Sequence, residues 1–208
     1  TSDPAVFGDI FERIRSRCDV VICATTGGGL GMSIEERVKV VHDFHPELAS
    51  FNAGSINFAL FDLPDRMNVP EWKHDWELPY LRMTKDFIFR NTFKSLEELP
   101  QMFVRYGTSA EAEVYDSGML NNLAYLVDRG FLNKPVYVQF VLGIMGAMPA
   151  SVENLMFLLQ TARRTFGNDF VWSVCAAGRF QIPLSTTALL LGGNVRVGME
   201  DSLWLEKG

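Results

Sequence analysis

The sequence predicts an α/β fold of the (β/α)8 TIM-barrel class, incomplete here because only about six of the eight strand–helix units of a closed barrel can be counted. Short apolar runs alternate with amphipathic helical patterns along the 208 residues, which is typical of a parallel sheet covered by helices. Polar residues follow every expected strand, as they do around the active-site face of a barrel. An open doubly wound sheet needs such residues mainly at one switch point, so the barrel fits better.

The expected strands are short runs of apolar residues bounded by glycine or polar residues. In chain order they are residues 20–24, 48–52, 112–115, 136–142, 172–176 and 194–198. The first run contains no charged residue and predicts a fully buried strand. The third run contains Glu113 beside Val114. A carboxylate in a buried strand costs free energy unless it has a partner, so Glu113 indicates a functional site.

The helices between these strands are expected from apolar stripes at helical spacing and from residues that favour helix starts. In chain order they should begin at Pro4, after capping boxes at Ser33 and Ser95, and after Ser151; residues 120–127 should lie in another helix, and residues 186–191 should form a short one. In a capping box, a serine at the helix start and a glutamate three residues later satisfy each other's backbone amides.

One long segment, residues 58–93, interrupts the alternation. It is rich in aromatic residues, and its three prolines argue against a continuous helix. Its length predicts an excursion over an active site or at a subunit contact. We expect residues 1–208 to form a single partial barrel domain that carries this excursion.

Composition excludes several classes of partner. The net charge of −6, with interspersed signs, argues against a nucleic-acid-binding surface. No apolar run approaches the length of about 18 residues needed to span a membrane, and the first residues do not resemble a signal peptide. A cytoplasmic protein that binds small molecules is therefore expected. The cysteines lack a metal-binding spacing and are expected to be buried apolar groups. His42 and His45 indicate the surface end of a helix.

The densest group of charged residues follows the last expected strand. Alternation along that strand sends Arg196 and Gly198 to one side, and Glu200 and Asp201 come next. The residues alone leave two interpretations open. One is a solvated ion pair. The other is a site in which one carboxylate binds a metal and the second transfers a proton, while Arg196 holds the second carboxylate or an anionic substrate.

Residues 25–29, Thr-Thr-Gly-Gly-Gly, follow the first expected strand. They can present hydroxyl groups and closely approaching backbone amides to an anion. The segment lacks the spacing of nucleotide-binding loops, and a flexible strand-to-helix turn is the alternative interpretation.

Five ordered motifs, each at the end of an expected strand, resemble the β-keto acid cleavage enzyme family, and the similarity covers essentially the whole chain. The motifs are residues 25–28, 46–58, 113–119, 139–143 and 192–201. The resemblance implies a (β/α)8 barrel assembled as a homotetramer. It also implies a reaction in which a β-keto acid and acetyl-CoA give acetoacetate and a new acyl-CoA.

The family's zinc, or another divalent metal in its place, is held by a His-x-His pair and by a glutamate that matches Glu200. The resemblance places the His-x-His pair before Thr1, and this chain contains no such pair. The first two strands of the barrel and the segment after the last one are therefore expected to lie outside this chain.

The resemblance assigns further roles position by position. Asp201 matches the general base, and Arg196 matches the arginine paired with it. Thr25 and Ser50 match residues whose hydroxyls meet substrate oxygens, and Glu113 matches a glutamate that meets an amino group of the substrate in one member. The excursion at residues 58–93 departs from that member, so an amino-bearing substrate is in doubt.

Two alternatives remain open. A metal-dependent hydrolase on the same barrel would also combine a metal with a carboxylate base, but it would turn over without acetyl-CoA. A catalytically incomplete fragment, acting as a scaffold or binding protein, is the second alternative.

Overall fold

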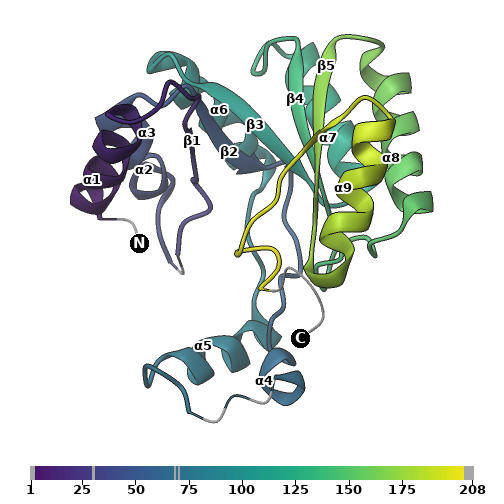
Figure 1. The fold of residues 1–208 in the computed structure, drawn as a ribbon. Coiled ribbons are helices and arrows are strands. Elements are labelled where there is room, and N and C mark those ends of the chain that lie inside the picture. Colours follow the sequence, from purple (N-terminus) through teal and green to yellow (C-terminus); the bar gives the residue numbers. More distant parts are fainter. Residues whose placement is uncertain (1–2, 30, 68, 70, 204–208) are drawn as a thin grey trace.

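The computed structural model describes residues 3–29, 31–67, 69 and 71–203. A six-stranded, all-parallel sheet has the same strand order in space as along the chain. The strands are β1 (Cys23–Ala24), β2 (Leu48–Asn52), β3 (Ser109–Val114), β4 (Val136–Leu142), β5 (Phe170–Ala176) and β6 (Asn194–Val195). The sheet curls into part of a barrel with helices outside it (Figure 1). The predicted incomplete (β/α)8 fold is therefore confirmed.

The two outermost strands are shorter than the sequence predicted. Val20 and Val21 are 53% and 64% exposed, so the prediction of a fully buried strand over residues 20–24 was wrong. The reason is position, because β1 lies at the edge of the sheet and pairs only with β2. At the other edge β6 ends before Arg196, whose backbone N–H still donates to the Val174 carbonyl at 2.8 Å.

The helices pack mainly through leucine and phenylalanine side chains. They are α1 (Pro4–Arg15), α2 (Ile34–Arg37), α3 (Lys39–Phe44), α4 (Leu63–Arg66), α5 (Glu77–Met83), α6 (Phe93–Arg105), α7 (Ser117–Asp128), α8 (Val152–Phe166) and α9 (Gln181–Leu190), with 3-10 turns η1 (Thr84–Asp86) and η2 (Gly178–Phe180). Leu123 of α7, Leu158 of α8 and Phe103 of α6 are completely buried. Each such side chain contributes about 1.5–3 kcal/mol through burial. Within the described ranges, no helix is long and apolar enough to cross a bilayer.

Of the two predicted capping boxes, one forms and the other does not. Ser33 and Glu36 form the expected box, with bonds of 3.2 Å and 2.7 Å. Ser95, in contrast, lies inside α6, which begins at Phe93 with Thr92 at the N-cap. The helix starts earlier because Thr92 already has the extended backbone of a cap, and its hydroxyl lies 3.4 Å from that of Ser95. Helix α9 also begins five residues earlier than predicted, at Gln181.

The segment between β2 and α6 leaves the sheet and returns to it. Ile56 and Phe89 form an antiparallel bridge at its base, with backbone hydrogen bonds of 3.0 Å and 2.9 Å. Beyond the bridge, α4 and α5 project away from the sheet (Figure 1). Arg82 of α5 donates to both carboxylate oxygens of Asp65 on α4, at 2.8 Å and 2.6 Å, and so ties the two helices together.

Candidate active site

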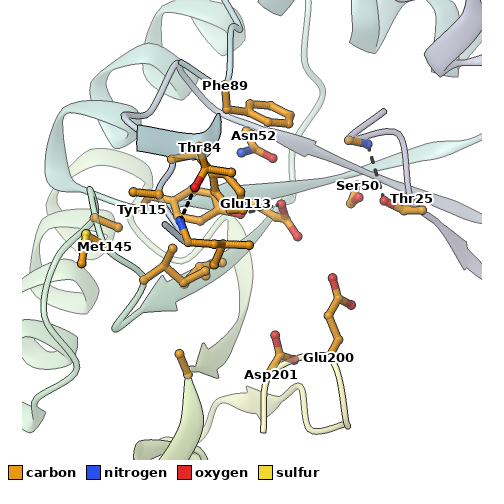
Figure 2. A pocket seen from close by; sticks show the side chains of 18 of the residues that line it. Thr25, Ser50, Asn52, Thr84, Phe89, Glu113, Tyr115, Met145, Glu200 and Asp201 are labelled. Atoms are coloured by element: carbon orange, nitrogen blue, oxygen red, sulfur yellow. Dashed lines mark hydrogen bonds between the residues drawn. The ribbon is translucent and has the colours of Figure 1, made fainter. Parts of the chain in front are cut away.

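The carboxyl ends of the strands open into one large cavity, with a volume of about 2310 Å³. Figure 2 shows side chains from β2, from β3 and from the segment after β6 lining the same space. This is the arrangement that parallel strands impose, because their carboxyl ends lie at the same edge. The structure brings together all the site residues named from the sequence: Thr25, Ser50, Glu113, Arg196, Glu200 and Asp201.

Arg196 lies at the centre of a network of side chains that accept its hydrogen bonds. Its Nε and Nη2 donate to the two carboxylate oxygens of Asp201 at 3.0 Å and 3.1 Å. Its Nη1 donates to Glu113 Oε1 and to Gln139 Oε1, both at 3.1 Å. Nη2 also lies 2.9 Å from Glu200 Oε2. One planar guanidinium therefore orients Asp201 by two-point contact and links β3 and β4 to the segment after β6.

The three carboxylates around Arg196 differ in their exposure to solvent. The side chains of Asp201 and Glu113 are only 9% and 11% exposed, whereas that of Glu200 is 83% exposed. Asp201 is therefore shielded and fixed, and Glu200 lies at the rim of the cavity. A shielded carboxylate suits proton transfer, and an exposed one is free to meet a ligand.

Burial controls the protonation of this cluster. It raises the pKa of Glu113, and the opposing effects of Arg196 and Tyr115 do not outweigh it. The Tyr115 hydroxyl donates to Glu113 Oε2 at 3.1 Å, and burial together with the charge of Glu113 raises the pKa of Tyr115. Burial opposes the charge on Arg196, but the neighbouring Cys175 and Asp201 outweigh it and raise its pKa. Tyr115 therefore stays a donor, and Glu113 is closer to its neutral form than an exposed glutamate.

The structure adds residues that the sequence argument did not select. Glu111 is buried on β3, two residues before Glu113 and on the same face, and it lines the cavity. The spacing Glu-Ala-Glu was a signal for it, since residues two apart in a strand share a face. Arg37 lines the cavity as well, but it lies on a short helix with no distinctive pattern.

The cysteines and histidines differ in their exposure to solvent. Cys175 is buried as expected, but Cys18 and Cys23 are exposed, so that expectation was wrong for two of the three. Both precede or belong to β1, the edge strand, where the sheet gives little cover. His42 and His45 lie exposed at the end of α3, as predicted.

The described residues do not form a complete zinc site. A structural or catalytic zinc needs at least three protein ligands, mostly nitrogen or sulfur. In the described part of the chain, no three histidine, cysteine or acidic side chains are grouped to hold a metal ion. The histidines are engaged elsewhere: His42 with Asp43, His45 with the Tyr106 carbonyl and His74 against the Trp76 ring. Glu200, whose side chain is 83% exposed, is one of several carboxylates that line the cavity.

Comparison with known proteins identifies the family. The sequence model described as "beta-keto acid cleavage enzyme" matches residues 1–208. This chain belongs to the β-keto acid cleavage enzyme family. The resemblance seen in the five sequence motifs is therefore confirmed.

Curated members of the family are similar along the whole chain. A 3,5-dioxohexanoate:acetyl-CoA acetone transferase of Paraburkholderia graminis is 46% identical over 208 residues, covering 100% of this chain and 66% of that protein. A 3-keto-5-aminohexanoate cleavage enzyme of Fusobacterium nucleatum is 31% identical over 209 residues, covering 100% of this chain and 65% of that protein. The chain thus spans slightly less than two thirds of the length of these relatives.

A solved structure agrees with the fold. The structure titled "Apo structure of ObcA" superposes with a TM-score of 0.71 at 18% sequence identity, covering 98% of this chain and 46% of that chain. At this identity the likeness supports the fold alone.

Proposed function

We propose that this chain is the larger part of an enzyme that converts a β-keto acid and acetyl-CoA into acetoacetate and a new acyl-CoA. The observation that carries the proposal is the shielded, two-point contact between Arg196 and Asp201 at the carboxyl end of the sheet. Membership of the family and the acetyl-CoA named for the 46% identical relative support it.

Asp201 is the general base of this proposal. It removes a proton from the carbon between the keto and carboxylate groups of the substrate, where the resulting negative charge is delocalised. Arg196 fixes the orientation of the Asp201 carboxylate by two-point contact, and a bound substrate that excludes water from the cavity strengthens this interaction. Thr25 and Ser50 offer hydroxyl groups to the substrate oxygens, and Glu113 contacts the substrate's side chain.

In the proposed reaction, each bond that forms is matched by a bond that breaks. The carbanion attacks the acetyl carbonyl of acetyl-CoA, forming a carbon–carbon bond and releasing the CoA thiolate. The thiolate then attacks the original keto carbon, and the bond between that carbon and its former neighbour breaks. Acyl-CoA leaves, and Asp201 returns its proton to the carbanion, which becomes acetoacetate.

We further propose that the whole enzyme depends on zinc or another divalent metal. Glu200 is its ligand from this chain, and a His-x-His pair outside the chain supplies the others, as the family resemblance implies. In the full-length protein, Glu200→Gln should lose bound metal, whereas Asp201→Asn should keep it. Metal analysis of both purified variants tests this, and equal metal content in the two would refute the assignment of Glu200.

The activity is tested by incubating the full-length protein with β-keto acids and acetyl-CoA and measuring acetoacetate. The panel should hold 3,5-dioxohexanoate, 3-keto-5-aminohexanoate and 3-oxoadipate, which the names of similar proteins suggest. We expect acetoacetate release that requires acetyl-CoA. Consumption of the keto acid without acetyl-CoA would indicate a hydrolase, and no turnover of any member of the panel would contradict the proposal.

We propose that the enzyme is a cytoplasmic homotetramer and that residues 1–208 act as one partial barrel domain. The mass of the full-length protein by light scattering should be four times that of its chain. A monomeric mass would contradict this part of the proposal.

A further inference from the structure

Arg37 is a buried cation at the end of α2, on the wall of the cavity formed by loop 25–29. The residue is 9% exposed. Its Nε donates to the Thr26 carbonyl at 2.8 Å, and its Nη1 donates to Asn91 Oδ1 at 2.9 Å. Its Nη2 is buried and has no hydrogen-bond partner among the residues described. Both partners that it does have are uncharged.

Nothing in the described structure neutralises this charge. None of the ion pairs between described residues includes Arg37. Its other neighbour is the face of the Phe89 ring, 5.5 Å away, which stabilises a cation modestly. Burial lowers the pKa of Arg37, but a guanidinium stays protonated in proteins. The guanidinium therefore places an unpaired positive charge in this part of the cavity wall, at a cost that an anionic ligand would offset.

Loop 25–29 lies directly on this side chain. Gly28 has a φ of +70°, and a Cβ at Gly28 would lie 2.5 Å from Arg37 Cγ, so the backbone is packed against the arginine stem. Thr26 connects the two candidate substrate-binding residues. Its carbonyl accepts from Arg37, and its hydroxyl donates to the Ser50 carbonyl at 2.5 Å. Arg37 is therefore linked through Thr26 to the backbone of Ser50, and it holds the residue that follows Thr25.

Asn91 ties the same arginine to the base of the excursion. Its Nδ2 donates to the Asn52 carbonyl at 2.8 Å, and its backbone N–H donates to Ser55 Oγ at 2.9 Å. Phe89, two residues earlier, forms the bridge that closes the excursion. Figure 2 shows Thr25, Ser50, Asn52 and Phe89 on the side of the cavity away from Glu200 and Asp201. Loop 25–29 thus has an anchored position opposite the proposed base.

We propose that Arg37 is a positioning residue for the β-keto acid. It fixes loop 25–29, and its charge favours the substrate's carboxylate at this loop, so that the carbon to be deprotonated faces Asp201. The inference rests on the proposed function, because it assumes an anionic substrate. Arg37 acts through the loop and through its field, since its free Nη2 is covered.

The test compares an anion with a neutral molecule of similar shape. Acetoacetate and acetylacetone differ in that a methyl group replaces the carboxylate's charged oxygen. Calorimetry measures their affinities for the full-length protein and three variants: Arg37→Met, which removes the charge and keeps an apolar stem; Arg37→Lys, which keeps the charge; and Arg163→Met, a control on the exposed face of α8.

We expect Arg37→Met to weaken acetoacetate binding by at least about tenfold, or 1.4 kcal/mol, and acetylacetone binding by less than about threefold. Arg37→Lys should recover part of the acetoacetate affinity, and Arg163→Met should behave like the original protein. If Arg37→Met does not fold, Arg37→Gln takes its place, because it also removes the charge but can still donate to the Thr26 carbonyl.

If Arg37→Met weakened the binding of acetoacetate and acetylacetone equally, Arg37 would have only a structural role, and the inference would be overturned. Unchanged acetoacetate affinity in a folded variant without the charge would overturn it as well. Failure of the proposed function looks different, because the unsubstituted protein would then neither bind acetoacetate nor release it from any β-keto acid.

Discussion

Two arginines line the same cavity, and their surroundings differ sharply. Arg196 contacts the carboxylates of Asp201, Glu113 and Glu200. Arg37 contacts a carbonyl, an amide and an aromatic ring, with no carboxylate beside it in the part of the chain that the structure describes. Both side chains have the same chemistry, so the difference in their proposed roles comes entirely from their neighbours.

The comparison shows that charge is distributed unevenly around the cavity. A guanidinium surrounded by carboxylates orients them and leaves no excess positive charge to attract an anion. A guanidinium without a counter-ion leaves the wall around it positive. A β-keto acid has the matching asymmetry, with an anionic carboxylate beside the carbon that loses a proton. In the proposed binding mode, its carboxylate lies at loop 25–29 and its reacting carbon lies near Asp201.

The largest effect is expected at the proposed base. Asp201→Asn should lower kcat for the best β-keto acid by at least about a hundredfold, because general base catalysis contributes roughly 10²–10⁴ to a rate. The fold should survive, since the amide oxygen can still accept from Arg196. Steady-state kinetics measures the loss. Asp169→Asn is the control, because the Asp169 side chain forms an exposed ion pair with Lys134 outside the cavity. A kcat within threefold of the original would remove Asp201 as the base.

The next effect separates geometry from charge at Arg196. Arg196→Lys keeps the charge but cannot hold Asp201 at two points and reach Glu113 as well. We expect kcat/KM to fall by at least about tenfold, or 1.4 kcal/mol of transition-state stabilisation. Arg82→Lys is a matched control, because Arg82 makes the same two-point contact with Asp65 on the exposed excursion. Its substitution should change kcat/KM by less than about twofold, and equal losses in both variants would contradict the role of Arg196.

The sequence was sufficient for features set by local patterns. The alternation of apolar runs and helical stripes gave the fold, and polar residues after the strands gave the face on which the cavity lies. Arg196 and Asp201 are five residues apart, so a turn alone can bring them together. The ends of β1 and β6 were misjudged because the number of neighbouring strands, and not the apolar run, decides where an edge strand stops.

Long-range contacts could not be predicted in the same way. Arg37 and Asn91 are 54 residues apart, and they meet only because the excursion returns to the sheet at the Ile56–Phe89 bridge. The position of that return depends on packing between elements. Likewise, the sequence suggested that Glu113 faces a site, but it gave no sign that Arg196, 83 residues later, donates to it.

A smaller effect is expected from crowding Arg37 without changing its charge. Gly28→Ala adds a Cβ that would lie 2.5 Å from Arg37 Cγ, so the loop or the arginine has to shift. Gly31→Ala is the control, because its φ of +75° gives the same backbone strain, yet a Cβ there meets no atom within 4 Å. Both variants should lose about 1–3 kcal/mol of stability from strain. Only Gly28→Ala should also raise the KM for the β-keto acid, by roughly threefold to tenfold. Equal KM values would show that the loop does not need its contact with Arg37.

The smallest effect concerns Glu111, a buried carboxyl of the cavity wall that has no proposed catalytic role. Burial raises its pKa above the ordinary value of 4.5, and Cys23 and Arg196 only partly oppose this. A raised pKa means that the folded state holds the proton more tightly than the unfolded state does. The resulting stability is fully present when the pH is below the ordinary pKa of 4.5, and it is lost as the pH rises through the higher pKa of the folded protein.

Glu111→Gln should therefore stabilise the protein at pH 8, with a Tm higher by about 2 °C or more, and the gain should shrink as pH falls towards 4. Glu153→Gln provides a control of opposite sign. Hydrogen bonds from its own backbone amide and from Ser151 lower the pKa of Glu153. Its carboxylate therefore stabilises the protein when the pH is above the ordinary pKa of 4.5. Its substitution should thus lower the Tm at pH 8, and the loss should shrink in acid. Thermal unfolding across this pH range distinguishes the two. If the Tm of Glu111→Gln followed the same dependence on pH as the Tm of the original protein, the ionised Glu111 would be as well stabilised as an exposed carboxylate. The contrast between the surroundings of Arg196 and Arg37 would then be a weaker guide to the charge along the cavity wall.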